Sequence, residues 1–171
     1  QLVGPGRTID TDRYFVVSSN MLGSSYGSTG PKSIDPATGK PYGPGFPELT
    51  LADMVTAQRR LLDRLGVKHL VAVVGPSYGG FQAFAWGVQY PGFMDGIAPV
   101  VSAPKARADA DAGALERRLA ADPNWNGGWY YDRGGIAGTM AALREETLRR
   151  YGVEQELLPR IPDKAARDAE I

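Results

Sequence analysis

Hydrophobic residues along the chain form short continuous runs separated by stretches with helical spacing. The continuous runs are typical of buried strands and cover residues 14–19, 70–74 and 97–101. The run 70–74 shows no alternation, so we expect it to be covered on both faces. An amphipathic helix is predicted from the N-cap residue Thr50 to the stop at Gly66, and a second over 79–90 before Pro91. This alternation of strands and helices predicts a doubly wound parallel sheet.

Two other segments differ in composition. Residues 21–47 are rich in glycine and proline, and Tyr26, Tyr42 and Phe46 are apolar anchors that favour an ordered loop over a disordered one. After Ser102 the sequence is rich in Ala, Arg, Asp and Glu and predicts helices over 109–121, 135–151 and 153–160. We therefore expect residues 1–104 to belong to a sheet-containing core and residues 105–171 to form a helical cap over the sheet edge.

Charge and composition narrow the range of functions. The 171 residues carry 19 basic and 19 acidic side chains, which argues against nucleic acid or an anionic membrane surface as a partner. The chain has no cysteine and one histidine, so thiolate chemistry and a protein-only metal site are not expected. It has neither a membrane-spanning apolar stretch nor a signal peptide, and its start at Gln1 suggests missing upstream residues. We expect a cytoplasmic protein that acts on a small molecule.

One motif indicates chemistry. Gly75-x-Ser77-x-Gly79 lies where the run 70–74 ends and a helix begins, which is the context of the nucleophile elbow in the α/β-hydrolase fold. Gly75, Gly79 and the adjacent Gly80 allow the sharp turn, and the backbone N–H of Tyr78 is placed to donate to an oxyanion. The alternative is that the glycines only permit a tight crossing and that Ser77 caps the helix.

A serine nucleophile needs a base, and His69 is the single histidine of the sequence. It precedes Ser77 along an extended strand by eight residues, or roughly 25 Å, which is far beyond hydrogen-bond reach. His69 is therefore expected to be a half-exposed surface residue. In the α/β-hydrolase order the acid and the histidine follow the serine, so the triad is not expected to close within this chain. Three strands are also few for this fold, which suggests a piece of a longer enzyme.

Further motifs are distributed along the chain: Gly4-Pro5-Gly6, Gly27-Ser28-Thr29-Gly30-Pro31, residues 36–43, Asp53-Met54-Val55, Tyr90-Pro91 and Asn126-Gly127-Gly128. With them and the elbow, the chain resembles the homoserine O-acetyltransferase family of α/β-hydrolases over most of residues 4–104 and part of the cap. The resemblance implies that Ser77 takes an acyl group from acetyl-CoA or an ester, with no bound cofactor. It also implies an acid and a histidine downstream of Ile171, a second oxyanion donor upstream of Gln1, and a homodimer formed through the cap.

Departures from the family pattern bear on the substrate. Pro76 and Tyr78 replace a glycine and an apolar residue of the usual elbow, and the Tyr78 ring is expected to change the pocket wall. Thr139 stands where the family carries an arginine for the homoserine carboxylate, and a hydroxyl cannot supply that bidentate pair. Arg133 and Arg144 are candidate substitutes, although each also fits a solvated helix charge.

The sequence thus favours a serine esterase or acyltransferase whose acceptor is water or an alcohol other than homoserine. The alternative is a true homoserine O-acetyltransferase, and a third hypothesis is a non-catalytic binding module that retains the elbow as architecture. The cap aromatics Trp125, Trp129, Tyr130 and Tyr131 are expected to pack the cap onto the sheet, with an acyl or leaving-group pocket as the alternative.

Overall fold

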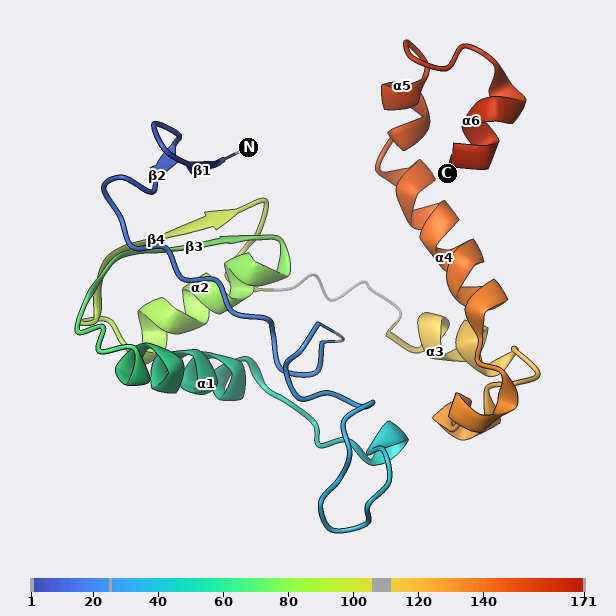
Figure 1. Cartoon of the computed structure of the whole chain (residues 1–171), viewed down its shortest axis with the longest axis horizontal. Coiled ribbons are helices and arrows are strands. Elements are labelled where there is room, and N and C mark those ends of the chain that lie inside the picture. The colour runs from blue at the N-terminus through green and yellow to red at the C-terminus, as the bar shows by residue number, and fades with distance from the viewer. Residues whose placement is uncertain (1, 25, 106–111, 171) are drawn as a thin grey trace. The chain divides into compact units, whose positions relative to one another are not determined.

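The computed structural model describes residues 2–24, 26–105 and 112–170 (Figure 1). The chain forms two compact units, Gln1–Ala108 and Asp109–Ile171. The first unit contains β1 (Val3–Gly4), β2 (Ile9–Asp10), the 3-10 turn η1 (Gly43–Gly45), α1 (Leu51–Arg64), β3 (Leu70–Pro76), α2 (Tyr78–Gln89) and β4 (Met94–Val100). The second contains α3 (Ala112–Ala120), η2 (Asn126–Gly128), η3 (Tyr131–Arg133), α4 (Ala137–Arg150), α5 (Val153–Leu157) and α6 (Lys164–Glu170).

Helix α1 begins and ends where the sequence predicts. The Thr50 hydroxyl accepts a hydrogen bond from the Asp53 N–H, and the Asp53 carboxylate accepts one from the Thr50 N–H, which completes a capping box. Beyond the last turn Gly66 has φ +75°, a conformation that favours glycine. Met54, Val55 and Leu62 form the buried face of the helix.

The sheet that carries the elbow is parallel and, in the described residues, consists of β3 and β4. Their register pairs Leu70 with Met94 at one end and Pro76 with Val100 at the other. Helix α2 packs against both strands and α1 packs against α2, as Figure 1 shows. Strand β4 starts three residues earlier than predicted because the pairing with β3 also recruits the Met94-Asp95-Gly96 segment, which has no strand signal of its own.

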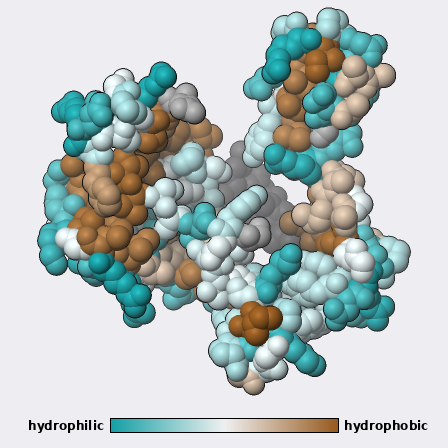
Figure 2. Space-filling model, viewed as in Figure 1, coloured by the Kyte–Doolittle hydropathy of each residue, from teal (hydrophilic) through white to brown (hydrophobic). Residues whose placement is uncertain are grey.

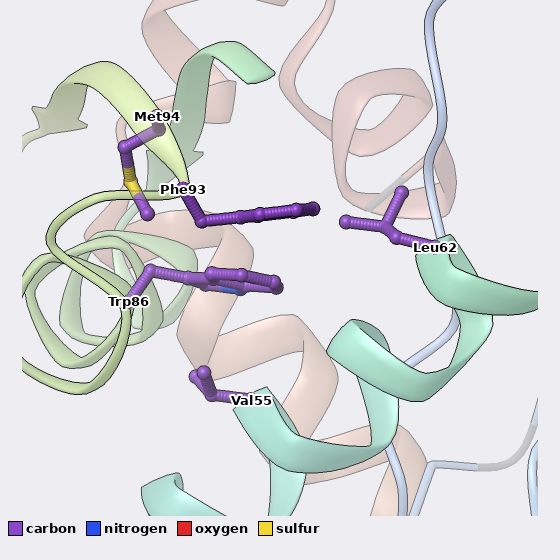
Figure 3. Packing of buried hydrophobic residues seen from close by; sticks show 5 residues of the cluster. All are labelled: Val55, Leu62, Trp86, Phe93 and Met94. Atoms are coloured by element: carbon purple, nitrogen blue, oxygen red, sulfur yellow. The ribbon is translucent and has the colours of Figure 1, made fainter. Parts of the chain in front are cut away.

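The core of the first unit lies between α1, α2 and the start of β4 (Figure 3). The Trp86 and Phe93 rings stack with their centroids 6.1 Å apart, and the Arg59 guanidinium lies 3.7 Å from the Phe93 centroid. This cluster joins the two helices to the sheet and so fixes the direction in which α2 leaves the elbow. Its buried members are Val55, Leu62, Trp86, Phe93 and Met94.

Two predictions about strands are wrong. Residues 14–19 form no strand, and Phe15 in that run is 79% exposed, although Val17 packs against the core. An apolar run becomes a buried strand only when a neighbouring strand pairs with it, and the described residues place none beside this run. The β3 face is also not covered on both sides: Val71 and Val74 remain 57% and 45% exposed. Figure 2 shows the apolar surface that results over β3 and β4.

The glycine- and proline-rich loop is ordered by its own backbone. The Asp35 N–H donates to Lys40 and the Gly43 N–H donates to Pro31, each over 2.8 Å. Tyr42 and Phe46 meet edge to face, whereas Tyr26 is 79% exposed and does not anchor the loop. The ordered-loop prediction is confirmed for all but residue 25, which lies outside the described residues.

The second unit is helical, as predicted. The predicted helices over 135–151 and 153–160 correspond to α4 and α5, and α6 was not predicted. The predicted helix 109–121 is described from Ala112 onward, and its first residues lie outside the described part. Arg149 on α4 forms ion pairs with Glu154 on α5 and Asp168 on α6, at 3.3 Å and 2.9 Å, which hold these helices together. That this unit is a cap over the sheet edge stays a prediction.

Candidate active site

Ser77 lies between the last residue of β3 and the first residue of α2. Its φ of 49° and ψ of −117° fall outside the regions that residues other than glycine normally occupy. The Ser77 N–H donates to the Val100 carbonyl over 2.9 Å, and its carbonyl accepts from the Gly80 N–H over 2.9 Å. A strained serine held by hydrogen bonds on both sides at a strand-to-helix turn is the geometry of a nucleophile elbow.

The capping alternative is not supported. Although Ser77 occupies the N-cap position of α2, its hydroxyl makes no capping hydrogen bond. The side chain is exposed, so the hydroxyl is accessible to a substrate. The free N–H groups of the first turn of α2, including that of Tyr78, lie directly after it. The arrangement therefore suits attack on a carbonyl carbon and stabilisation of the resulting oxyanion.

The three elbow glycines have different steric roles. A Cβ on Gly75 would lie 2.1 Å from the Gly79 carbonyl oxygen, and a Cβ on Gly80 would lie 2.3 Å from the Ser102 Cβ. A Cβ on Gly79 would meet only the Pro76 ring, at an ordinary 3.5 Å. Gly75 and Gly80 are thus required by close packing, whereas Gly79 matters because its backbone passes close to Gly75.

The Tyr78 side chain contacts other residues of the first unit. Its ring contacts Phe81 edge to face, with centroids 6.1 Å apart, and its hydroxyl lies 4.0 Å from the Met54 sulfur. The ring stays 44% exposed beside the nucleophile. This placement is consistent with the predicted wall of a pocket next to Ser77, which remains a prediction.

His69 cannot be the base of Ser77. It directly precedes β3, at the end opposite the elbow, and its Nε2 lies 2.7 Å from the Asp95 carboxylate. The side chain is 49% exposed, as predicted for a surface residue. Within residues 2–24, 26–105 and 112–170, no group of three His, Cys, Asp or Glu side chains is placed to hold a metal ion. In the same ranges, no helix is long and apolar enough to cross a bilayer.

The residues predicted to bind substrate in the cap lie in the second unit. The Thr139 hydroxyl donates to the Asp122 carboxylate over 2.5 Å, and together with the Asn124 N–H it lowers the pKa of Asp122. Thr139 thus has a role within its own unit, holding the turn before η2 against α4. Arg133, at the end of η3, and Arg144, on α4, are exposed. Substrate binding by these three residues stays a prediction.

The cap aromatics pack on one another. Trp125 stacks on Tyr130 at 5.8 Å and Tyr130 contacts Tyr131 at 4.9 Å, between ring centroids. Burial and the neighbouring Tyr130 raise the pKa of Tyr131. Trp129 lies outside this stack and is 45% exposed. These contacts lie within the second unit, so packing of the cap onto the sheet by these aromatics stays a prediction.

Two features near the elbow were not predicted. One is Ser102, whose buried hydroxyl faces Gly80; a small residue just after a strand was the only sequence signal. The other is a buried polar chain between α1 and α2, in which the Trp86 indole N–H donates to Gln58 over 2.7 Å and Gln58 donates to Gln82 over 2.6 Å. Glutamines at helical positions resemble surface residues, so no sequence signal indicates these hydrogen bonds.

Comparison with known proteins identifies the family. Residues 6–170 match the family model described as alpha/beta hydrolase fold. The chain belongs to the α/β-hydrolase family. This match confirms the α/β-hydrolase fold that the elbow predicts, and it includes residues of both units.

Relatives within the α/β-hydrolases confirm the resemblance to homoserine O-acetyltransferases. The homoserine O-acetyltransferase of Moorella thermoacetica is 51% identical over 152 residues, which cover 88% of this chain and 41% of that protein. The homoserine O-succinyltransferase of Comamonas testosteroni is 49% identical over 135 residues, covering 78% of this chain and 33% of that protein. The crystal structure of esterase E22 superposes with a TM-score of 0.72 at 39% identity, covering 81% of this chain and 41% of that chain. The chain thus spans about two fifths or less of the length of these relatives.

Proposed function

We propose that this chain is the nucleophile-bearing part of a homoserine O-acyltransferase that works through an acyl-enzyme on Ser77. The observation that carries the proposal is the strained, doubly hydrogen-bonded and uncapped serine between β3 and α2. Curated relatives that are about half identical to the chain and act on homoserine support the choice of acceptor. The sequence favours an esterase, with homoserine acetylation as the alternative, and the relatives support the alternative better than the esterase.

In the proposed reaction the Ser77 hydroxyl oxygen attacks the carbonyl carbon of an acyl-CoA thioester while a base takes its proton. The oxyanion that forms accepts a hydrogen bond from the Tyr78 N–H, aided by the positive end of the α2 dipole. Collapse of this intermediate expels the thiolate, which receives the proton, and leaves an ester on Ser77. The homoserine hydroxyl oxygen then attacks the carbonyl carbon of that ester while the base takes its proton. The bond to the Ser77 oxygen breaks, the serine regains the proton, and O-acylhomoserine leaves.

The proton acceptor is not provided by His69, which is occupied at the other end of β3. We propose that the base and its acidic partner belong to the portion of the relatives' length that this chain does not span. The acyl group is either acetyl or succinyl, since relatives of both kinds match at similar identity. A homodimer remains a prediction drawn from the resemblance.

Ester hydrolysis is the second candidate function. The solved esterase E22 shares 39% identity with the chain. Thr139 stands where the resemblance places an arginine for the homoserine carboxylate, and its hydroxyl donates to Asp122 instead, which also favours this candidate. In that reaction water replaces homoserine in the second step, and the acyl-enzyme is unchanged.

The test uses the full-length protein that contains this chain. Acetyl-CoA and succinyl-CoA are each supplied with homoserine, and a short-chain aryl ester is supplied separately. Fast acylation of homoserine supports the first candidate, whereas fast ester hydrolysis without homoserine acylation supports the second. Ser77→Ala is expected to abolish both activities, while the matched Ser18→Ala, at an exposed serine of the same unit, retains them. A protein that is inactive in every assay would refute the proposal and favour a binding module.

A further inference from the structure

The chain turns sharply where β4 ends beside the elbow. Val101 has φ +51°, a rare conformation for a β-branched residue, and its own side chain is 90% exposed. The next residue, Ser102, instead directs its side chain inward, and its hydroxyl oxygen is completely buried. The strained turn at Val101 thus exposes an apolar side chain and buries a small polar one, which is the reverse of the usual preference.

The Ser102 side chain occupies the space that Gly80 leaves free. A Cβ built on Gly80 would lie 2.3 Å from the Ser102 Cβ and 2.7 Å from its Oγ. The Ser102 hydroxyl has no hydrogen-bond partner among the described residues. Ser102 therefore contributes the volume of its side chain here, and its Cβ lies closer than its Oγ to the position of a Cβ on Gly80.

Gly80 is in turn part of the support of the nucleophile. Its N–H donates to the Ser77 carbonyl over 2.9 Å, and the Ser77 N–H donates to the Val100 carbonyl over the same distance. The end of β4 therefore holds the elbow at two points, through Val100 by a hydrogen bond and through Ser102 by contact with the first turn of α2.

We propose that Ser102 is a positioning residue of the active site: its side chain fills the notch at Gly80 and fixes the first turn of α2 relative to Ser77. The inference rests on the proposed acyl-enzyme on Ser77. When this contact is lost, the turn moves toward the space at Ser102 and carries the Tyr78 N–H away from the oxyanion. An error of about 1 Å in such a donor is enough to slow the chemistry by up to about a hundredfold.

The first test replaces Ser102 in the full-length protein and follows p-nitrophenyl acetate hydrolysis and melting temperature. Ser102→Gly is expected to lower kcat about tenfold or more, with KM within about twofold and little change in melting temperature. Ser102→Ala retains the Cβ and is expected to keep kcat within about twofold. Ser24→Gly is the matched control, because it also removes a buried serine hydroxyl without a described partner, in the glycine- and proline-rich loop and not at the notch beside Gly80.

The second test moves the Cβ from one residue to the other. Gly80→Ala alone is expected to be poorly active or insoluble. The double variant Gly80→Ala with Ser102→Gly is expected to be more soluble and more active than Gly80→Ala, with the new Cβ still 3.2 Å from the Gly75 carbonyl oxygen. A Ser102→Gly variant with normal kcat, or a double variant no better than Gly80→Ala, would overturn the inference while leaving Ser77 as nucleophile. If the unsubstituted protein does not acylate Ser77, as read by mass spectrometry, the proposed function fails and this inference fails with it.

Discussion

Gly75→Ala provides a severe test of the elbow. The new Cβ would lie 2.1 Å from the Gly79 carbonyl oxygen and 2.3 Å from its carbonyl carbon. Heavy atoms of this kind require about 3.5 Å, so β3 and the first turn of α2 would have to separate by about 1 Å or more. Neither side can yield by a side-chain rotation, because the obstacle is backbone. We therefore expect a loss of about 3 kcal/mol in the free energy of unfolding, the upper part of the range for overpacking.

The matched control is Gly79→Ala, whose Cβ would meet only the Pro76 ring at 3.5 Å. Alanine is also the better helix former at this position in α2, so stability is expected to stay within about 1 kcal/mol. Urea unfolding of the full-length protein measures stability, and the rate of labelling by a fluorophosphonate measures the reactivity of Ser77. Gly75→Ala is expected to label about a hundredfold more slowly than Gly79→Ala. Equal stability and equal labelling of the two variants would refute the close-packing argument.

Three further substitutions test other parts of the structure. Gln58→Leu removes the acceptor of the Trp86 N–H and the donor to the Gln82 side-chain oxygen, and is expected to cost about 1–3 kcal/mol in urea unfolding. A neutral result would exclude a structural role for these hydrogen bonds. Thr139→Val is expected to raise the pKa of Asp122 toward its ordinary 3.8, as measured by NMR titration. Because folding lowers this pKa, the ionised Asp122 stabilises the folded protein above pH 3.8, and this stabilisation is lost as the pH falls below that value. An unmoved pKa would show that the Asn124 N–H dominates. Thr50→Ala removes the cap of α1 and is expected to cost about 1 kcal/mol, measured in the same way, and no change would mean that the helix end is held by packing alone.

Features fixed by neighbouring residues were predictable from the sequence. Thr50 and Asp53 cap α1, and Gly66 ends it, because these effects act within one helical turn. The elbow was predictable because five apolar residues, a serine between glycines and a helix pattern follow one another without a gap. The position of His69 followed from the rise of an extended strand alone.

Features that depend on distant residues were not predictable. The run around Phe15 has strand-forming residues, but its state depends on whether another strand pairs with it. The start of β4 at Met94 depends on pairing with Leu70, which overrides the weak local preference of that segment. The contact between Ser102 and Gly80 joins residues that are far apart in sequence, and neither residue type indicates such a contact.

The hydrogen bond from the Ser77 N–H to Val100 makes the serine the last rung of the β3–β4 ladder. Positions along a ladder are discrete, since a strand can shift against its neighbour only by whole residues of about 3.3 Å. A shift of that size would turn the side chains of β3 to the other face of the sheet and break the hydrogen bond between Ser77 and Val100. The register of β3 against β4 therefore fixes the position of Ser77 to within one residue, and the turn that follows makes only smaller adjustments.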